Sequence, residues 1–473
     1  MVRMNVNDEE QFKYYYGPRY LPNSLRENTE QAVINVWKLF LNDDSLVVAT
    51  KNGMSVFNLV PYTLKNKEKI LSPITEARHN RFGLTSDCAL KNYGDLSSFE
   101  MHDSDNDGLW TSMTVASLAF KYAVTKDPNV KKQAWKHVNG LKLLNDITNI
   151  PGLPARSALH QTSDPGYGHW HNSTNPTYNG WIWKGDTSSD EIVGHLFAYP
   201  LVHDLLAETT EEKYLAKSLI LNITKYIIQN NYFLMDVTGK RTTWGVWNPK
   251  YLNDDPEWDD ERGINSLQIL SWLVSAKRIA EGTPDQELIK KALQDLLNHD
   301  YLTNIINCKI LHPQDLNYSD DELNYLPYFT WMWADMKSNN HTLKDNLEFH
   351  ASITRTFTHI KDYKSPLWSV MTGIYHQHIR PTNFQEQDLI DGIESLRQWP
   401  LEQIKWNVLN EHRLDVTPSR YPSRHDQFRI RELLPYNEIA CFRFNCDPYQ
   451  VNGGSGFVEY EPTAFMLPYW LAR

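Results

Sequence analysis

The sequence has few cysteines, no excess of basic residues and no long apolar run. Four cysteines (Cys88, Cys308, Cys441 and Cys446) among 473 residues do not make a disulfide scaffold, and we expect buried thiols at all four. A net charge of −11 argues against nucleic acid or an anionic membrane as the main partner. No apolar run is long enough to span a membrane, and the first ten residues lack a signal-peptide core. We therefore expect a soluble protein, cytoplasmic by default, that binds a small molecule or an oligosaccharide.

The chain also lacks alternating strands and helices and short internal repeats. The first absence excludes a doubly wound parallel sheet, and the second makes a regular solenoid less favourable. Apolar residues at three- and four-residue spacing predict helices after about residue 70, which favours a helical bundle, solenoid or toroid. The predicted helices cover 109–124, 130–145, 191–207, 212–229, 264–281, 286–298, 342–360 and 387–397.

Both ends of the chain differ from this helical part. Residues 33–41, 45–50 and 54–57 read as three short strands separated by Asn, Asp and Gly, which predicts one small antiparallel sheet packed on the body. After Trp406 the chain becomes irregular again and closes on an apolar run, 465–470.

Four acidic, polar loops each lead into a largely apolar helix. In two of them, Ser188 with Glu191 and Ser319 with Glu322 have the spacing of a capping box. If these are successive inner helices of one ring and point the same way, their acidic ends meet in one funnel, which is the candidate site. The four loops are 102–108, 186–191, 259–262 and 317–322.

The funnel predicts acid and base catalysts. A glycosidase needs one protonated and one ionised carboxyl group, and Asp186, Asp190, Asp320 and Asp321 are the candidates. Because a helix N-terminus lowers the pKa of a carboxyl group, the general acid must be additionally buried or crowded by like charge. We expect Asp186 rather than Asp190 to contact substrate, since Asp186 precedes the helix cap and is free to project.

The run Asp103-x-Asp105-x-Asp107-Gly108 matches the start of an EF-hand calcium loop. The twelfth position is Thr114 rather than the usual bidentate Glu. The loop predicts a site for Ca²⁺ or another divalent cation, with plain helix-start carboxylates as the alternative. No organic cofactor is implied.

Further candidates lie in long aromatic loops, which are usually functional when they connect elements of a compact domain. We expect His171 and His412 to act as catalytic bases, and Arg262 and Arg413 to bind a substrate carboxylate or pair with nearby acids. The remaining predicted substrate contacts are His169, Trp181, Trp183, His195, Trp247 and Tyr328.

Several motifs resemble those of a family of largely uncharacterised, mostly bacterial proteins. They are Tyr16-Gly-Pro-Arg-Tyr-Leu-Pro, Ala77-Arg-His-Asn-Arg-Phe-Gly-Leu, Asp103-Ser-Asp-Asn-Asp-Gly-Leu-Trp-Thr, Trp183-Lys-Gly-Asp-Thr-Ser-Ser-Asp-Glu, Ser319-Asp-Asp-Glu-Leu and Leu467-Pro-Tyr-Trp. The resemblance implies a mainly α fold: an α/α toroid of six-hairpin type over 71–415, a propeller-like β segment over 1–70, and an irregular closing segment over 416–473.

That family is distantly similar to toroid glycoside hydrolases and polysaccharide lyases, which is an analogy of fold. Together with the acidic, aromatic funnel, it predicts a carbohydrate-active enzyme that cleaves glycosidic bonds by carboxylate acid/base catalysis. The alternatives are a polysaccharide lyase or epimerase with a His or Tyr base, a terpenoid-type cyclase or isomerase, and a non-catalytic glycan-binding protein.

Overall fold

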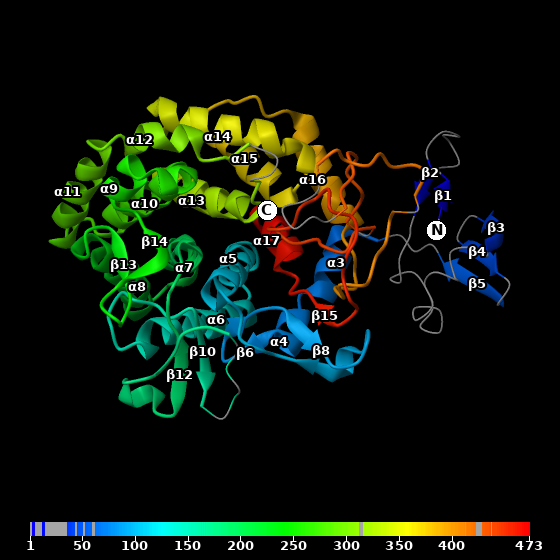
Figure 1. Cartoon of the computed structure of the whole chain (residues 1–473), viewed down its shortest axis with the longest axis horizontal. Coiled ribbons are helices and arrows are strands. Elements are labelled where there is room, and N and C mark those ends of the chain that lie inside the picture. The colour runs from blue at the N-terminus through cyan, green and yellow to red at the C-terminus, as the bar shows by residue number, and fades with distance from the viewer. Residues whose placement is uncertain are drawn as a thin grey trace.

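The computed structural model describes residues 62–473 except 162, 164, 166, 312–315, 412, 422–427 and 437, and five strands before residue 59. Strands β1 (Val2–Met4) and β2 (Phe12–Tyr14) form one antiparallel pair. Strands β3 (Val36–Asn42), β4 (Ser45–Thr50) and β5 (Gly53–Asn58) form an antiparallel sheet, which confirms the predicted strands. Figure 1 shows both sheets to one side of the helical body.

The body is mainly helical, and more than half of the described residues are in helices. Each of the eight predicted helical segments coincides with a helix, which confirms the helical periodicity as the main signal. The helices are α3 (Leu64–Leu71), α4 (Ile74–Arg78), α5 (Asp107–Thr125), α6 (Pro128–Ile147), α7 (Ser189–Leu201), α8 (Thr210–Gln229), α9 (Pro249–Asp254), α10 (Asp259–Ile279), α11 (Asp285–Leu297), α12 (Tyr301–Asn304), α13 (Ser319–Met336), α14 (Leu347–Ile360), α15 (Pro366–His378), α16 (Glu386–Gln398) and α17 (Thr463–Leu471).

Six helices pack against one another in a closed series. Helix α5 contacts α7, α7 contacts α10, α10 contacts α13, α13 contacts α15, α15 contacts α17, and α17 contacts α5. Helix α7 also contacts α13 directly. Their sequences explain the central position: in α10 every residue from Gly263 to Leu273 is buried, as expected for a helix enclosed on all sides. Figure 1 shows α5, α13 and α17 near the middle of the body.

The remaining long helices cover the central ones. Helix α6 packs on α5, α8 on α7, α11 on α10 and α16 on α15. Each has a single buried stripe; in α11 it consists of Ile289, Ala292 and Leu296, the spacing of one helical face. An amphipathic helix of this kind buries one face and leaves the other in solvent. In Figure 1, α11 and α14 lie at the rim of the body.

The long aromatic connections are folded into small sheets. Strands β10 (Ser157–His160), β12 (Trp181–Lys184) and β11 (Trp170–Asn172) form one sheet, with Ala158 opposite Trp183. Strands β13 (Phe233–Met235) and β14 (Arg241–Val246) form a hairpin. These sheets fix the orientation of the residues that precede α7 and α9.

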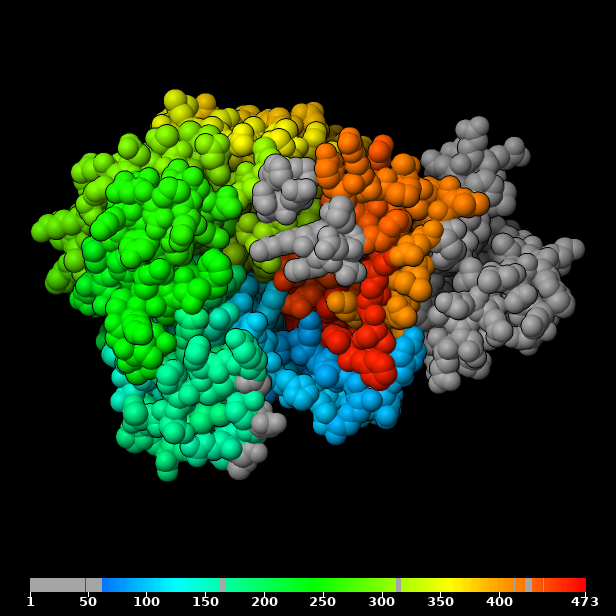
Figure 2. All heavy atoms as spheres, in the orientation of Figure 1, coloured from blue at the N-terminus to red at the C-terminus, as the bar shows by residue number. Residues whose placement is uncertain are grey.

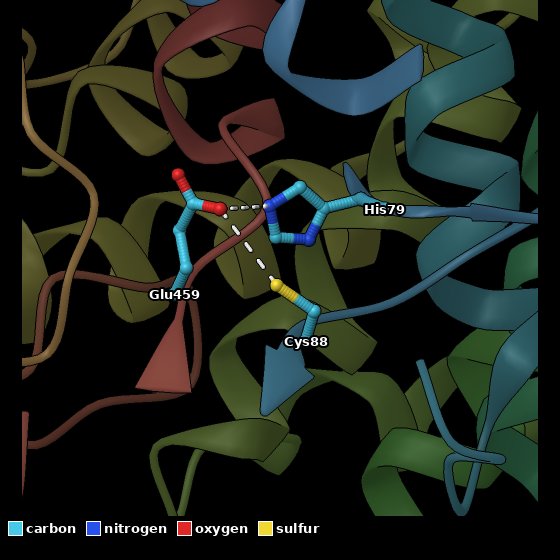
Figure 3. Close-up of side chains that lie close together, drawn as sticks. All are labelled: His79, Cys88 and Glu459. Atoms are coloured by element: carbon cyan, nitrogen blue, oxygen red, sulfur yellow. Dashed lines mark hydrogen bonds and ion pairs between the residues drawn. The ribbon is translucent and has the colours of Figure 1, made fainter. Parts of the chain in front are cut away.

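The C-terminal segment is joined to the start of the body. Strand β15 (Val458–Glu459) pairs with β8 (Cys88–Leu90), which also pairs with β9 (Phe99–Glu100). Figure 2 shows the red C-terminal residues directly against the blue residues that follow residue 62. Where β8 and β15 meet, three buried side chains come together, those of His79, Cys88 and Glu459 (Figure 3).

Two expectations for this segment are wrong. Its last part is not irregular, because the apolar run forms α17, which packs on α5 and extends the helical body beyond residue 415. Cys441 and Cys446 form a disulfide, so the expectation of buried thiols holds only for Cys88 and Cys308. Sequence spacing could not show that a local turn brings the two C-terminal sulfurs together.

No helix among the described residues combines the length and the apolar character needed to cross a membrane.

Candidate functional site

The N-termini of α5, α7, α10 and α13 converge, as the acidic loops predicted. Asp105, just before α5, contributes to the raised pKa of Asp190 in the first turn of α7. Asp190 in turn contributes to the raised pKa of Asp320 in the first turn of α13. Glu261, in the first turn of α10, acts on Asp320 in the same direction. Carboxylates from four separate helices therefore share one electrostatic environment.

Asp320 is the partly buried acid at the centre of this group. Its pKa is raised to about 8: burial is the largest cause, the nearby Glu261 adds to the increase, and Lys309 opposes it. One carboxyl oxygen accepts a hydrogen bond from Asn317 Nδ2 at 2.7 Å. At neutral pH this group therefore holds a proton while remaining partly accessible.

Glu322 lies two residues further along α13 and is buried. Its pKa is raised to about 8: burial is the largest cause, Arg443 opposes the increase, and Asp190 adds to it. Its Oε1 atom has no hydrogen-bond partner in the described structure. A buried, unpaired carboxyl oxygen is costly, so this group also holds a proton at neutral pH. The sequence pattern predicts only a helix-capping role for Glu322.

That capping box and the one before α7 are both wrong. Neither helix has a side-chain cap of the predicted type: α13 already includes Ser319, and at α7 tertiary partners replace the local ones. Ser188 donates to Asn106 Oδ1 at 2.8 Å. Glu191 is buried and accepts a hydrogen bond from the backbone N–H of Gly108 at 3.0 Å, so it links α7 to α5.

His195, a predicted substrate contact, is buried next to Glu191. Its Nδ1 atom is 2.8 Å from the hydroxyl of Tyr199, and its Nε2 atom is 3.6 Å from Glu191 Oε2. Burial lowers the pKa of His195 to about 3, and burial raises the pKa of Glu191 well above its ordinary value. The pair is thus a neutral imidazole beside a protonated carboxyl group, enclosed in the protein.

Asp190 is partly buried, and burial raises its pKa while a hydrogen bond from Ser188 lowers it. Asp321 is buried and forms an ion pair with Lys309 at 2.6 Å. Of the two, Asp190 has the environment of a group that can contact substrate. Asp321 instead anchors Lys309.

Asp186 does not project freely, contrary to the prediction. Its carboxylate accepts hydrogen bonds from the backbone N–H of Thr243 at 2.7 Å and from the Thr243 hydroxyl at 2.9 Å. Its backbone has a positive φ of 51°, which these bonds and Arg156, donating to its carbonyl at 3.3 Å, hold in place. Asp186 therefore ties the start of α7 to β14.

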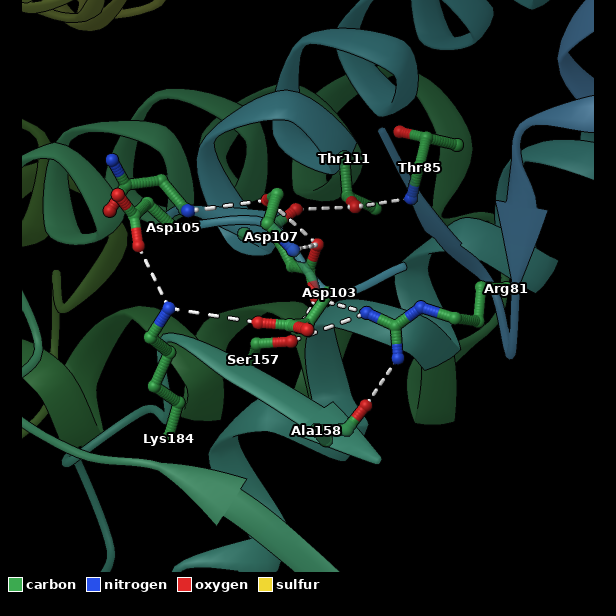
Figure 4. Close-up of polar contacts among 12 residues, drawn as sticks. Arg81, Thr85, Asp103, Asp105, Asp107, Thr111, Ser157, Ala158 and Lys184 are labelled. Atoms are coloured by element: carbon green, nitrogen blue, oxygen red, sulfur yellow. Dashed lines mark hydrogen bonds and ion pairs between the residues drawn. The ribbon is translucent and has the colours of Figure 1, made fainter. Parts of the chain in front are cut away.

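The aspartates of the predicted calcium loop are paired with cations (Figure 4). Asp105 accepts a hydrogen bond from Lys184 Nζ at 2.8 Å, and Asp103 lies 3.7 Å from the same atom. Asp107 is buried and pairs with Arg81. Their oxygens do not form a group of three within metal-binding reach of one another, and calcium binding here stays a prediction.

Four of the predicted residues lie in or next to the sheet of β10, β11 and β12. His171 packs against the buried ring of Trp183 with ring centres 4.6 Å apart, and its Nε2 atom is buried without a partner. Trp181 contacts the half-exposed ring of Phe82 at 4.8 Å. His169 is exposed and contributes its carbonyl oxygen to the backbone of Gly185.

Four other predicted residues have structural partners. Trp247 is buried and donates to Gln268, and Tyr328 is buried within 2.9 Å of Cys308 Sγ and 2.6 Å of the Ser352 hydroxyl. Arg262 pairs with Asp259, and Arg413 pairs with Asp415 and Glu438. These contacts place the residues in the core or in ion pairs, although Arg262 directly follows Glu261 in α10. His412 lies outside the described residues.

Arg443, which no sequence motif indicated, is held in the turn closed by the Cys441–Cys446 disulfide. Its guanidinium lies 3.9 Å from the centre of the Trp110 ring, forms an ion pair with Asp87, and lowers the pKa of Glu322. Arg443, Trp110 and Asp87 line a small pocket beside α17. A cation and an indole ring therefore border the acidic group.

No family profile, curated protein or solved structure matches this chain.

Proposed function

We propose that this protein is a carbohydrate-active enzyme that cleaves glycosidic bonds, and that its body is an α/α toroid of six-hairpin type. The closed series of contacts through α5, α7, α10, α13, α15 and α17 supports an inner ring of six helices. The covering helices α6, α8, α11 and α16 support an outer layer. In such a ring, the converging acidic N-termini line the mouth of a funnel.

The observation that carries the proposed activity is the raised pKa of Asp320. A glycosidase needs a carboxylic acid that is still protonated at working pH and can protonate the leaving oxygen. Burial and the like charge of Glu261 raise the pKa of Asp320 to about 8, and the side chain stays partly accessible. These are the means by which proteins keep a catalytic carboxyl group protonated.

Asp190 is the proposed second carboxylate. It lies at the N-terminus of α7, whose positive end favours its ionised form, and it is close enough to Asp320 to affect its pKa. In this role it activates water or attacks the sugar carbon directly. The negative surroundings stabilise the positive charge that develops on the sugar ring in the transition state.

The surroundings favour hydrolysis over the alternatives. A lyase needs an accessible His or Tyr base, but Tyr328 is buried among hydroxyl and thiol groups, and His171 packs against Trp183. Of the described candidates for that base, only His169 is exposed. The predicted carboxylate-binding arginines, Arg262 and Arg413, are engaged in ion pairs. Trp110, with Arg443 over its ring, offers an aromatic surface beside the acids.

The proposal is tested by assaying release of reducing ends from a panel of oligosaccharides and polysaccharides. On any substrate that is cleaved, Asp320→Asn should lower turnover by about two to four orders of magnitude, because the proton donor is lost. Asp285→Asn is the matched control, since Asp285 also lies in the first turn of a helix but follows the C-terminal end of α10 and pairs with Lys225. Full turnover in folded Asp320→Asn would remove Asp320 from the reaction.

A further inference from the structure

A buried group of three metal-type side chains lies outside the proposed catalytic site. His79 follows α4, Cys88 lies in β8 and Glu459 lies in β15, so the group joins three segments of the chain. The three side chains are at most 1% exposed. Figure 3 shows the imidazole, thiol and carboxylate pointing toward one another. Among the described residues, no other three His, Cys, Asp or Glu side chains bring their ligand atoms within 4.8 Å of each other.

The spacing of the three ligand atoms matches a tetrahedral metal site. Glu459 Oε2 lies 3.2 Å from His79 Nε2 and 3.7 Å from Cys88 Sγ. Zinc bonds of about 2.0–2.3 Å in a tetrahedron separate neighbouring ligand atoms by roughly 3.3–3.7 Å. Two of the three separations are therefore those that a shared ion requires, and the third, between the ligand atoms of His79 and Cys88, is within 4.8 Å.

The imidazole is oriented for metal binding by the backbone. His79 Nδ1 lies 2.8 Å from the carbonyl oxygen of Ser86, which can only accept a hydrogen bond. Nδ1 therefore carries the proton, and Nε2 directs its lone pair at Glu459. Two electron-rich atoms 3.2 Å apart in a buried site repel each other unless a cation or a second proton lies between them. A backbone carbonyl on the far ring nitrogen is the usual partner of a metal-binding histidine.

The carboxylate of Glu459 is held in the same way. Arg78 donates to both of its oxygens, each at 2.6 Å. Each carboxylate oxygen has two lone pairs, so Oε2 can accept from Arg78 and still bind a metal ion. Hydrogen bonds to a ligating carboxylate are a regular feature of metal sites because they fix its orientation.

We propose that His79, Cys88 and Glu459 bind a zinc ion that ties the C-terminal strand β15 to β8 and to the end of α4. A thiolate, an imidazole and a carboxylate suit zinc, whereas calcium and magnesium prefer oxygen ligands only. Binding releases the thiol proton of Cys88 to solvent, and a water molecule completes four coordination. Because the site is enclosed, its role is structural.

The first test measures zinc on the full chain. Protein purified without chelator should contain one zinc per chain by elemental analysis. After removal with a chelator, one equivalent of zinc should rebind and raise Tm, since a ligand that binds only the folded state stabilises it. Replacing zinc by cobalt should give a thiolate-to-cobalt charge-transfer absorption band. Absence of zinc uptake at micromolar concentration would overturn the proposal.

Matched variants assign the ligands. Cys88→Ser and His79→Gln should lose the bound zinc and the cobalt band. Cys308→Ser and His137→Gln should keep both. Cys308 is the other buried free thiol. His137 is a buried histidine whose partners are likewise a backbone carbonyl, of Gly83, and a carboxylate, of Glu76, but no thiol. Zinc retained in full by folded Cys88→Ser would also overturn the proposal. In the wild type, zinc should slow alkylation of Cys88, a measurement that does not depend on any variant folding.

Discussion

Glu261, in the first turn of α10, raises the pKa of Asp320, in the first turn of α13. The two side chains belong to different helices, so this effect exists only because the helices point their N-termini at the same place. It gives the proposed general acid a like-charged neighbour that is not itself part of the proposed chemistry. Glu261 is therefore a means of changing the pKa of Asp320 without touching the reacting groups.

We expect turnover to fall as pH rises through about 8, because Asp320 loses the proton that it must donate. Glu261→Gln removes the like charge, so the pKa of Asp320 and the alkaline limb should move down by roughly 0.5–1 pH unit. Glu257→Gln, an exposed acid in the preceding turn, is the control and should leave the limb in place. The measurement is the pH–rate profile, and an identical alkaline limb in both variants would contradict the role of Asp320.

The raised pKa of Glu322 predicts how stability depends on pH. Its folded-state value is about 8, above the ordinary 4.5, so the folded protein binds this proton more tightly than the unfolded chain. The contribution of the bound Glu322 proton to the free energy of unfolding is fully present below about pH 4.5 and is lost as pH rises toward 8. Glu322→Gln should therefore flatten the fall in the free energy of unfolding over this window, by on the order of 1 kcal/mol per pH unit. Urea denaturation at pH 5 and pH 8 measures it, and parallel pH dependences in the two proteins would exclude the effect.

Gly108 allows α5 and α7 to approach closely. A Cβ atom at this position would lie 2.0 Å from Glu191 Oε2 and 2.7 Å from His195 Nε2. Gly108→Ala should therefore destabilise the protein by about 1–3 kcal/mol, the usual cost of overpacking, measured by chemical denaturation. Glu191→Ala makes room, so in the double variant the two losses should be less than additive. Strict additivity would show that the contact does not limit the packing.

Lys184 competes with any calcium ion for the aspartates of the Asp103–Asp107 loop. Its ammonium group lies 2.8 Å from Asp105 and 3.7 Å from Asp103, the position that a bound cation would take. We expect millimolar calcium to raise Tm more in Lys184→Met than in the wild type, since the competing charge is gone. Thermal denaturation with calcium and with chelator checks this. An unchanged Tm in both proteins would leave these aspartates as helix-start carboxylates.

The mainly helical character of the body was predictable, because apolar spacing alone indicates which segments form helices and which face they bury. The acidic loops also predicted that several helix N-termini converge. Local rules failed where distant partners compete: Glu191 bonds to Gly108 rather than to its own helix end, and Asp186 bonds to Thr243 on β14. Charge and capping patterns contain no information on such long-range partners.

Arg443 was unpredictable for the same reason. It contacts Trp110 and Asp87, which lie far away in the sequence, and the disulfide that surrounds it joins residues with no recognisable motif. The group formed by His79, Cys88 and Glu459 could not be predicted from the sequence either, because its three residues are spread from position 79 to position 459. Only the pairing of β8 with β15 brings them together.

The contact between α5 and α17 has a consequence for folding during synthesis. Helix α5 is among the first helices of the body to leave the ribosome, yet part of its apolar surface is covered only by α17, more than three hundred residues later. Until then that surface remains exposed, which makes the growing chain a substrate for chaperones. So many contacts between distant residues also predict slow, non-local folding. Translation past α17 should therefore be the step at which the nascent chain becomes resistant to protease.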